Sequence, residues 1–325
     1  MLEREQPTLG AVLRRATADL QSAGIDQAGN DARRLLAAVL GLSGAQVLSQ
    51  PERRLSAEQA VRLESCVARR RNREPVSRIL AKREFYGRSF AISPATLDPR
   101  PDSETLIEAA LECARLEQWL AAPLRILDVG TGSGCLLLTL LCELPNAVGV
   151  GTDMSEAALQ IARENARRLG VEHRAQWLVR DALDDVGCDF EVLVCNPPYV
   201  RSDDIARLEP EVRCFDPWSA LDGGDDGLHF FRRLAARIPS VIPSGWIVLE
   251  VGHDQADAVA GLLESSLSGI KSGDIEFCRD VTGVRRCVAA RTRIEHIPRK
   301  ALDSFAVRDR LSQVESSVCP LAAAD

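Results

Sequence analysis

Hydrophobic residues in the first part of the chain recur at the spacing of amphipathic helices, three or four positions apart. The runs that they form cover residues 8–24, 31–40 and 57–71. Thr8 and Ser56 are suited to cap the first and third runs, and Gly41 is suited to end the second. Because no alternating pattern typical of a strand interrupts these runs, we predict a small all-α domain over residues 1–74.

The next stretch has the signals of a short hairpin between two domains. Pro75 breaks the helical register, and residues 85–97 are predicted to form two short strands with Gly87 near their turn. Further prolines punctuate the passage into the following domain. We therefore expect a linker with a β-hairpin over residues 75–104.

From Thr105 onward, helical and strand patterns alternate. Strands are predicted over residues 125–129, 148–152, 176–179, 190–195, 246–251, 275–279 and 286–290. Helices are predicted over residues 105–116, from about 135, and over 156–169, 228–238 and 256–266. Such alternation predicts an α/β domain over residues 105–291, with a seven-stranded, mostly parallel sheet and helices on both faces. The connection over residues 280–283 is short enough only for antiparallel pairing of the last strand.

The length of 325 residues allows two domains with a hydrophobic core each. Residues 292–325 lie beyond the second predicted domain. They are polar and lack a clear period, so we expect a C-terminal extension that is either disordered or packed as one helix.

The charge balance is acidic, with a formal net charge of −7. It argues against bulk electrostatic binding to nucleic acid, and we expect no stable nucleic-acid complex. The stretch from Val67 to Arg100 is an exception, because basic residues outnumber acidic ones there. This stretch could be a docking face for an acidic or RNA-bound partner, but the pattern favours a solvated helix end.

Cysteine usage and hydropathy indicate a reducing compartment. The 10 cysteines include no C-x-x-C pair, and Cys135, Cys195 and Cys287 lie inside apolar runs, as small buried hydrophobic residues do. The 4 histidines show no ligand spacing, so no metal site is expected. Residues 1–6 lack the apolar core of a signal peptide, and no apolar stretch reaches the roughly 18 residues of a membrane span. A cytoplasmic protein without membrane contacts is the expectation.

A glycine-rich loop follows the first predicted strand of the α/β domain. It comprises Asp128, Val129, Gly130, Thr131, Gly132, Ser133 and Gly134. Glycines at alternate positions let the backbone turn tightly and approach a ligand closely. A dinucleotide fingerprint would need its third glycine at Cys135, so the spacing disfavours NAD and FAD. The loop suits a ligand whose amino-acid moiety lies over it, and a chance glycine-rich turn is the alternative.

Acidic residues end the second and third predicted strands of this domain. Asp153 could accept hydrogen bonds from both ribose hydroxyls of a nucleoside. It could instead cap the following helix, for which Ser155 is better placed. Asp181 could accept from an adenine amino group, directly or through the backbone of Ala182, although acidic residues at strand ends are also common turn formers.

The tetrapeptide Asn196-Pro197-Pro198-Tyr199 follows the fourth predicted strand, at the sheet edge where ligands bind in open α/β folds. The prolines restrict the backbone on both sides. The Asn196 oxygen and a neighbouring carbonyl would then form a rigid pair of acceptors for an N–H2 group, and Tyr199 could add a flat wall. A turn that merely ends a strand is the alternative.

The glycine-rich loop, Asp153 and the tetrapeptide, in this order, resemble the class I S-adenosylmethionine-dependent methyltransferases that act on amino groups. Within this class, further segments are similar to the release factor glutamine methyltransferases. They are Arg73–Pro75, Arg83–Gly87, Pro99–Glu104, Asp216-Pro217 and Ala220–Leu228. The chain departs from the usual family pattern at Ala81 (usually Gly), Ser103 (usually Thr), Asp216 (usually Glu) and Ala182 (an aromatic residue in some members). The resemblance covers residues 74–290.

This resemblance implies a Rossmann-like methyltransferase domain preceded by a helical substrate-recognition domain. It implies methyl transfer from S-adenosyl-L-methionine, with S-adenosyl-L-homocysteine as the product, to the side-chain amide nitrogen N5 of a glutamine. That glutamine lies in the Gly-Gly-Gln loop of peptide-chain release factors 1 and 2, which are the expected partners. We expect the enzyme to be a monomer.

The resemblance also implies roles for individual residues. The cofactor would contact Asp128, Gly130, Thr131, Gly132, Ser133, Gly134, Asp153, Asp181, Ala182 and Asn196. The catalytic residues would be Asn196, Pro197 and Tyr199, and further substrate contacts would come from Pro198, Phe85, Arg100 and Glu104. The asparagine oxygen and the following carbonyl would each accept one amide hydrogen, without a metal or a base. Phe85 could equally pack between the hairpin and the large domain, and Arg100 and Glu104 could form only a local ion pair.

Three other functions fit parts of the pattern. A DNA adenine or cytosine methyltransferase would use the same tetrapeptide on an exocyclic amine, but it should carry a basic recognition region. A glutamine methyltransferase for a ribosomal protein would share the two-domain layout, and Pro99–Glu104 favours the release-factor group over it. A binding protein without turnover is disfavoured because the tetrapeptide is complete.

Overall fold

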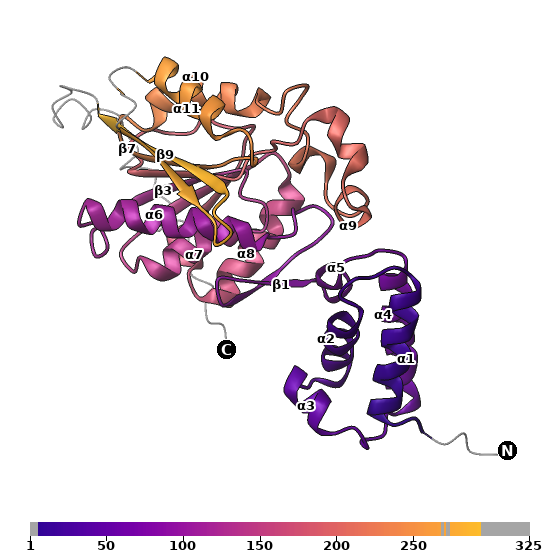
Figure 1. Cartoon of the computed structure of the whole chain (residues 1–325). Coiled ribbons are helices and arrows are strands. Elements are labelled where there is room, and N and C mark those ends of the chain that lie inside the picture. Colours follow the sequence, from indigo (N-terminus) through magenta and orange to yellow (C-terminus); the bar gives the residue numbers. More distant parts are fainter. Residues whose placement is uncertain (1–5, 268–269, 271–273, 294–325) are drawn as a thin grey trace, which may run out of the picture.

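The computed structural model of the chain describes residues 6–267, 270 and 274–293. Figure 1 shows a small bundle of helices near the N-terminus and a larger α/β domain, joined by a linker that carries a two-stranded hairpin. Of the predicted extension over residues 292–325, only the first two residues are described, and they belong to strand β9 (Arg285–Arg293).

The N-terminal bundle confirms the predicted helices and adds short ones. It consists of α1 (Leu9–Ser22), α2 (Ala28–Leu40), α3 (Gly44–Ser49), α4 (Ala57–Arg71) and α5 (Val76–Leu80). Thr8 and Ser56 cap α1 and α4 through their side chains, and Gly41 ends α2 in a left-handed conformation. Helices α3 and α5 were not predicted, because runs of 6 and 5 residues are too short to show a helical period.

The predicted linker hairpin is confirmed, but it lies earlier in the chain. Strands β1 (Lys82–Phe85) and β2 (Arg88–Ala91) pair antiparallel around Gly87. The predicted bounds, residues 85–97, were wrong. The chain after β2 leaves the pairing because Pro94, which has no N–H to donate, lies in a turn.

The sheet of the α/β domain has the strand order β5-β4-β3-β6-β7-β9-β8. Its strands are β3 (Arg125–Val129), β4 (Val148–Asp153), β5 (Ala175–Val179), β6 (Val192–Cys195), β7 (Ser244–Glu250), β8 (Ile275–Arg279) and β9. Neighbouring strands are parallel except that β9 runs antiparallel to β7 and β8. The prediction of a seven-stranded, mostly parallel sheet with an antiparallel last strand is confirmed.

Helices cover both faces of this sheet (Figure 1). They are α6 (Glu104–Leu116), α7 (Cys135–Glu143), α8 (Glu156–Leu169), α10 (His229–Val241) and α11 (Ala256–Ser266). The core on one face contains residues of α6, α7 and the hairpin, and that on the other contains residues of α10 and α11. The connections carry η1 (Pro101–Ser103), η2 (Glu172–Arg174), η3 (Ser202–Arg207), α9 (Pro210–Arg213) and η4 (Trp218–Ala220). Within the described ranges, no helix has the length and apolar character of a membrane span.

The strand order creates a crevice at the carboxyl ends of β3 and β6. From β3 the chain moves outward to β4 and β5, and then returns to β6 on the other side of β3. The loops that follow β3 and β6 therefore diverge, and ligands bind in open α/β sheets at such a switch point. The glycine-rich loop and the Asn-Pro-Pro-Tyr corner leave the sheet at this edge.

The basic stretch over residues 67–100 joins the bundle to the α/β domain. Arg70 is 8% exposed, and its guanidinium lies 2.7 Å from a carboxylate oxygen of Asp31 in α2 and 2.9 Å from one of Glu211 in α9. Arg73 reaches the other oxygen of Glu211 at 2.8 Å. Both interpretations of this stretch were wrong for these arginines, because they are neither a free docking face nor a solvated helix end.

Asp216 is the centre of a second group of ion pairs between the same two parts. Its carboxylate is buried and contacts Arg78 of α5 and Arg100 of the linker. It also accepts a hydrogen bond from the backbone N–H of Asp98 at 3.2 Å. Because Asp216 immediately precedes Pro217 and η4, these pairs tie the bundle to the loop that leads into α10.

Candidate active site

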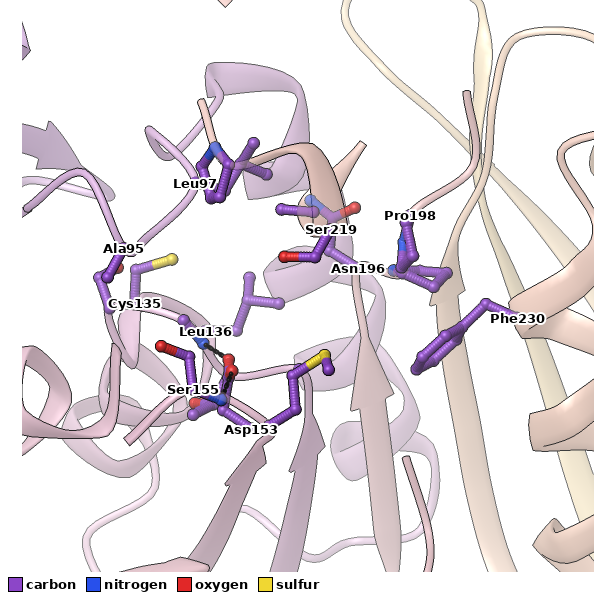
Figure 2. Close-up of a pocket in the computed structure, with 18 of the residues that line it drawn as sticks. Ala95, Leu97, Cys135, Leu136, Asp153, Ser155, Asn196, Pro198, Ser219 and Phe230 are labelled. Carbon is purple, nitrogen blue, oxygen red and sulfur yellow. Dashed lines mark hydrogen bonds between the residues drawn. The ribbon is translucent and has the colours of Figure 1, made fainter. Parts of the chain in front are cut away.

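A cavity opens at the carboxyl ends of β3, β4 and β6 (Figure 2). Its volume is about 970 Å³ including the part open to solvent, which is enough for a nucleoside-sized ligand. The predicted site residues that line it are Gly130, Thr131, Gly132, Ser133, Asp153, Asp181, Ala182, Asn196, Pro197 and Pro198. The predicted residues that do not line it are Asp128, Gly134, Tyr199, Phe85, Arg100 and Glu104.

The glycine-rich loop forms one wall of this cavity. Gly130, Gly132 and Gly134 all have positive φ angles, of 71°, 56° and 78°, which favour glycine. The N–H of Thr131 donates to the carbonyl of Thr152 at 2.9 Å, so the loop folds over the end of β4. The hydroxyl of Ser133 is buried, and it has no hydrogen-bond partner among the described residues. The wall therefore offers a polar atom whose partner would have to be a ligand or water.

Asp128 lies beneath the loop and is fully buried. Its carboxylate accepts hydrogen bonds from the hydroxyl of Thr131 at 2.6 Å and from the N–H of Leu137 at 3.3 Å. Burial raises the pKa of Asp128 to about 7, and the two hydrogen bonds oppose this effect. Asp128 thus holds the loop and the start of α7 in place, and it does not face the cavity as a direct ligand contact would.

Asp153 occupies the junction of the loop, β4 and α8. One carboxylate oxygen accepts from the N–H of Gly132 and the other from the N–H of Ser155, both at 2.9 Å. Ser155 itself caps α8 through Ala158 N, as the sequence favoured. Burial raises the pKa of Asp153, and the backbone hydrogen bonds lower it. A carboxylate oxygen has two lone pairs, so each still has room to accept from a ligand hydroxyl.

Asp181 and Ala182 line the cavity beyond the end of β5. The Asp181 carboxylate pairs with Arg233 of α10 at 2.9 Å. This ion pair ties the loop after β5 to α10, a contact that the sequence did not predict. Ala182 has a positive φ of 52°, and its carbonyl accepts from the hydroxyl of Thr152 at 3.3 Å. The aromatic residue on this side is Phe230 of α10, and Figure 2 shows its ring near Pro198.

The tetrapeptide forms the opposite wall. Asn196 Nδ2 donates a hydrogen bond to Ser103 Oγ at 3.2 Å. Within the part of the chain that the structure describes, no donor is bound to Asn196 Oδ1, so this oxygen is left to accept from a ligand. Tyr199 turns the other way, and its hydroxyl donates to Glu250 Oε1 at 3.3 Å. Its ring therefore supports the corner from outside the cavity.

Glu250 was not predicted from the sequence. It ends β7, beside β6, and it is 1% exposed. Burial raises its pKa to about 7, and the nearby hydroxyls of Ser103 and Tyr199 and the charge of Arg286 oppose this effect. An acidic residue at the end of an apolar strand was the available signal, but the neighbours that make it notable come from distant parts of the chain.

Phe85 belongs to the hydrophobic core and does not reach the cavity. It is 1% exposed, and its ring meets that of Phe90 edge-on with the centroids 6.2 Å apart. The prediction that it forms a wall beside the substrate is therefore corrected. The alternative holds, because an apolar ring at the end of β1 gains more from packing beneath the hairpin than from facing a polar site.

Arg100 and Glu104 do not form the predicted local ion pair. Arg100 has an extended backbone before η1, so the spacing of a continuous helix does not apply to it. It pairs with Asp216, whereas Glu104 accepts from the backbone N–H of Tyr86 at 2.9 Å. Neither side chain lines the cavity.

The linker segment 99–104 instead connects several walls of the site. Its polar contacts are Arg100 with Asp216, Asp102 with Arg286, Ser103 with Asn196, and Glu104 with Tyr86. These partners come from the loop before η4, from β9, from the tetrapeptide and from the hairpin turn. The segment resembling the family motif thus acts here as a structural strap over the cavity.

The strand order, the glycine-rich loop after β3, the acidic end of β4 and the Asn-Pro-Pro-Tyr corner after β6 together define a Rossmann-like methyltransferase. Two family models agree with this assignment. The chain matches the family models of the PrmC N-terminal domain over residues 11–80 and of the methyltransferase small domain over residues 112–208. A solved methyltransferase structure from Pyrococcus furiosus aligns with a TM-score of 0.46 and 17% identity, over 64% of this chain and 91% of that one.

Curated relatives are more similar. The release factor glutamine methyltransferase of Rhodospirillum rubrum is 47% identical over 292 residues, which are 90% of this chain and 87% of that protein. The proteins of the same name from Cereibacter sphaeroides and Bradyrhizobium diazoefficiens are each 42% identical over 86% of this chain, and over 96% and 93% of their own lengths. The chain therefore belongs to the release factor glutamine methyltransferase family, and it is a methyltransferase.

Proposed function

We propose that this enzyme methylates the glutamine side chain in the Gly-Gly-Gln loop of release factors 1 and 2, at the amide nitrogen N5. S-adenosyl-L-methionine would be the donor. The observation that carries the proposal is the orientation of Asn196, whose Nδ2 is committed to Ser103 while Oδ1 is left for an N–H2 group. The names of the curated relatives support the same acceptor.

The cavity residues fit S-adenosyl-L-methionine. Ser133 offers a buried hydroxyl without a partner among the described residues, beside the backbone of Gly132. These would hold the amino-acid moiety, Asp153 would accept from the ribose hydroxyls, and Phe230 and Ala182 would flank the adenine. When bound, the cofactor supplies a methyl group on a positively charged sulfur.

The acceptor needs positioning more than activation by a base. An amide nitrogen is a poor nucleophile because its lone pair is delocalised into the carbonyl. Asn196 Oδ1 and the Pro197 carbonyl would each accept one N–H, which fixes the direction from which the lone pair attacks. Orientation of this kind can lower a barrier by up to about 7–11 kcal/mol. The proton would leave after methyl transfer, when the nitrogen has become acidic.

We also propose that the helical part, residues 1–74, and the linker, residues 75–104, recognise the release factor. A groove between the bundle and the α/β domain supports this division. It is lined by charged residues from both parts, among them Asp26, Arg34 and Glu209. Such a groove can select a protein surface by charge complementarity.

A DNA base is the weaker acceptor candidate. The basic stretch that could have formed a recognition face is engaged internally, since Arg70, Arg73, Arg78 and Arg100 all pair with acidic residues of the same chain. These charges are not free to neutralise phosphates. The internal pairing favours a protein acceptor.

The test is methyl transfer from labelled S-adenosyl-L-methionine to purified release factors, with the site located by mass spectrometry and duplex DNA as a parallel acceptor. We expect label on the Gly-Gly-Gln glutamine alone. We expect Asn196→Ala to abolish transfer and to leave cofactor affinity, measured by calorimetry, nearly unchanged. Label on DNA would contradict the proposed acceptor, and an equal loss of cofactor binding in Asn196→Ala would contradict the role given to Asn196.

A further inference from the structure

The segment over residues 221–227 packs against the end of the tetrapeptide, outside the cavity. It belongs to the stretch Ala220–Leu228 that the sequence singled out, but it does not line the cavity itself. The chain leaves the tetrapeptide at Val200, whose N–H donates to the carbonyl of Leu221 at 2.9 Å and whose carbonyl accepts from the N–H of Gly223 at 2.8 Å. The backbone that follows the tetrapeptide is therefore paired with this segment.

Gln255 joins the segment to the tetrapeptide through its side-chain amide. It lies directly before α11 and is 5% exposed. Its Nε2 donates to the carbonyl of Tyr199 at 3.0 Å and to that of Gly227 at 3.3 Å, and its Oε1 accepts from the N–H of Gly252 at 3.0 Å. One buried side chain thus connects the corner after β6, the segment 221–227 and the chain after β7.

A side-chain amide is the group that matches these three backbone partners. Two carbonyls need two donors and one N–H needs an acceptor, and an amide carries both donors on its nitrogen and the acceptor on its oxygen. A carboxylate has no donor, and an apolar side chain would leave all three partners without a hydrogen bond. The partners also fix the orientation of the Gln255 amide, because the reversed amide would set N–H against N–H and oxygen against oxygen.

Glycines let the segment approach the backbone of Tyr199 directly. A Cβ on Gly227 would lie 2.5 Å from the Tyr199 carbonyl oxygen and 2.4 Å from Gln255 Nε2. A Cβ on Gly223 would lie 2.9 Å from Tyr199 Cα. The backbone of Tyr199 is therefore in close contact with the segment while the Gln255 amide holds its carbonyl.

The tetrapeptide depends on such contacts at its ends, because its two prolines have no N–H with which to hold their own positions. At its start it follows directly on β6. We propose that Gln255 is a positioning residue for methyl transfer: by holding the Tyr199 carbonyl, it keeps Asn196 Oδ1 and the Pro197 carbonyl at the spacing of two hydrogens on one nitrogen. The inference rests on the proposed function, which assigns these two oxygens to an N–H2 acceptor.

The decisive variant is Gln255→Met, which keeps the length of the side chain and removes both donors. We expect kcat on a saturating release factor to fall by about 10- to 100-fold, as when a remote change misplaces a reacting group. The Kd for S-adenosyl-L-methionine, measured by calorimetry, should stay within about threefold. Gln255 does not line the cavity, and the glycine-rich loop lies on the wall opposite the tetrapeptide.

The matched control is Leu263→Ala, further along the same helix. Leu263 is buried in the core between α11 and the sheet. Its truncation should lower the free energy of unfolding by about 2–5 kcal/mol and leave the kcat of the folded enzyme unchanged. A residue that matters only for folding would behave like this control, so a lower kcat in Gln255→Met isolates the positioning role.

A second variant, Gly223→Ala, displaces the tetrapeptide while Gln255 stays intact. Its new Cβ would meet Tyr199 Cα, and the φ of Gly223 is not in the left-handed region, so backbone strain does not contribute. We expect kcat to fall and cofactor affinity to stay within about threefold. Gly261→Ala is its control, because no atom lies within 4 Å of a Cβ there, and it should keep the wild-type kcat.

The inference fails if folded Gln255→Met keeps the wild-type kcat, or if its cofactor affinity falls as much as its kcat. If Gln255→Met does not fold, Gly223→Ala decides, and a wild-type kcat in that variant overturns the inference.

A substrate-free readout separates the inference from the proposed function. Hydrogen exchange of the Val200 and Gly223 N–H groups, followed by NMR and corrected for global stability, should be at least about tenfold faster in Gln255→Met than in Leu263→Ala. Equal exchange rates overturn the role of Gln255. A wild type that labels no release factor overturns the proposed function alone, and the exchange rates still decide whether Gln255 holds the tetrapeptide.

Discussion

At the scale of single residues, Asp153 has two duties that can be separated by experiment. It holds the N–H groups of Gly132 and Ser155, and it lines the cavity where ribose hydroxyls would lie. We predict that Asp153→Ala weakens S-adenosyl-L-methionine binding by at least about tenfold, as for a lost pair of hydrogen bonds. Isothermal calorimetry measures this directly.

The control for Asp153 is Asp184→Ala. Asp184 lies 3.9 Å from Arg237 in an exposed ion pair and does not line the cavity, so its loss should leave cofactor affinity unchanged. Thermal unfolding of both variants shows whether either has lost its fold. An unchanged dissociation constant in folded Asp153→Ala would remove this residue from the cofactor site.

The function of single residues was predictable where the residues that act together are neighbours in the sequence. The loop after β3 and the tetrapeptide after β6 both carry their signal within a few positions, and both line the cavity. The contacts of Ser103 and Glu250 were not predicted, because their partners Asn196 and Tyr199 lie 93 and 51 positions away in the chain. Only the pairing of β6 with β7 brings Glu250 to the corner.

At the scale of elements, Gly134 shows why the loop can pass so closely into α7. Its φ is 78°, and a Cβ there would lie 3.0 Å from Leu138, 3.1 Å from Trp177 and 3.2 Å from Ala162. We predict that Gly134→Ala lowers the free energy of unfolding by about 2 kcal/mol or more, from left-handed strain and overpacking. Urea denaturation measures this loss.

The matched control is Gly187→Ala. No atom lies within 4 Å of a Cβ at Gly187, and its φ is not in the left-handed region, so the free energy of unfolding should change by no more than about 0.5 kcal/mol. If Gly134→Ala is as stable as the wild type, the side chains around Gly134 can move aside for a Cβ at little cost in free energy.

Element prediction succeeded where periodicity was long and capped, and failed where elements were short. Strand β3 and helix α4 match their predicted bounds. The hairpin was displaced because its four-residue strands pair around Gly87, and the chain after Ala91 turns at Pro94 and Ala95. Helices α3 and α5 depend on packing in the bundle core, which no local pattern reveals.

At the scale of the whole molecule, Asp216 joins the two parts of the enzyme. It is buried between Arg78 and Arg100. We predict that Asp216→Asn lowers the free energy of unfolding by about 3–5 kcal/mol, because it leaves the buried guanidinium of Arg78 without its countercharge. Since Pro217, Ser219 and Ala220 line the cavity, cofactor affinity should fall as well.

Asp204→Asn is the control for this charge change. Asp204 pairs with Arg207 on the surface, three positions away, so its removal should cost no more than about 0.5 kcal/mol. Chemical denaturation and calorimetry of both variants provide the comparison. A stability of Asp216→Asn equal to that of Asp204→Asn would show that the joint between the parts is held by other contacts.

The division into a bundle and a doubly covered sheet was evident from the sequence, but the joint between them was not. Basic residues in a run look alike whether they face solvent, a partner or another part of the same chain. Arg70 became interpretable only when the fold placed Asp31 and Glu211 beside it.

The strap over residues 99–104 has a consequence for how this enzyme can change over time. A substitution within this segment removes one of its contacts and leaves the remaining residues opposite their own partners. An inserted residue adds roughly 3.3–3.6 Å of extended chain, more than any hydrogen bond can stretch. Insertion would uncouple Ser103 from Asn196 while Arg100 stayed with Asp216. This short stretch should therefore vary in composition among descendants while keeping its length.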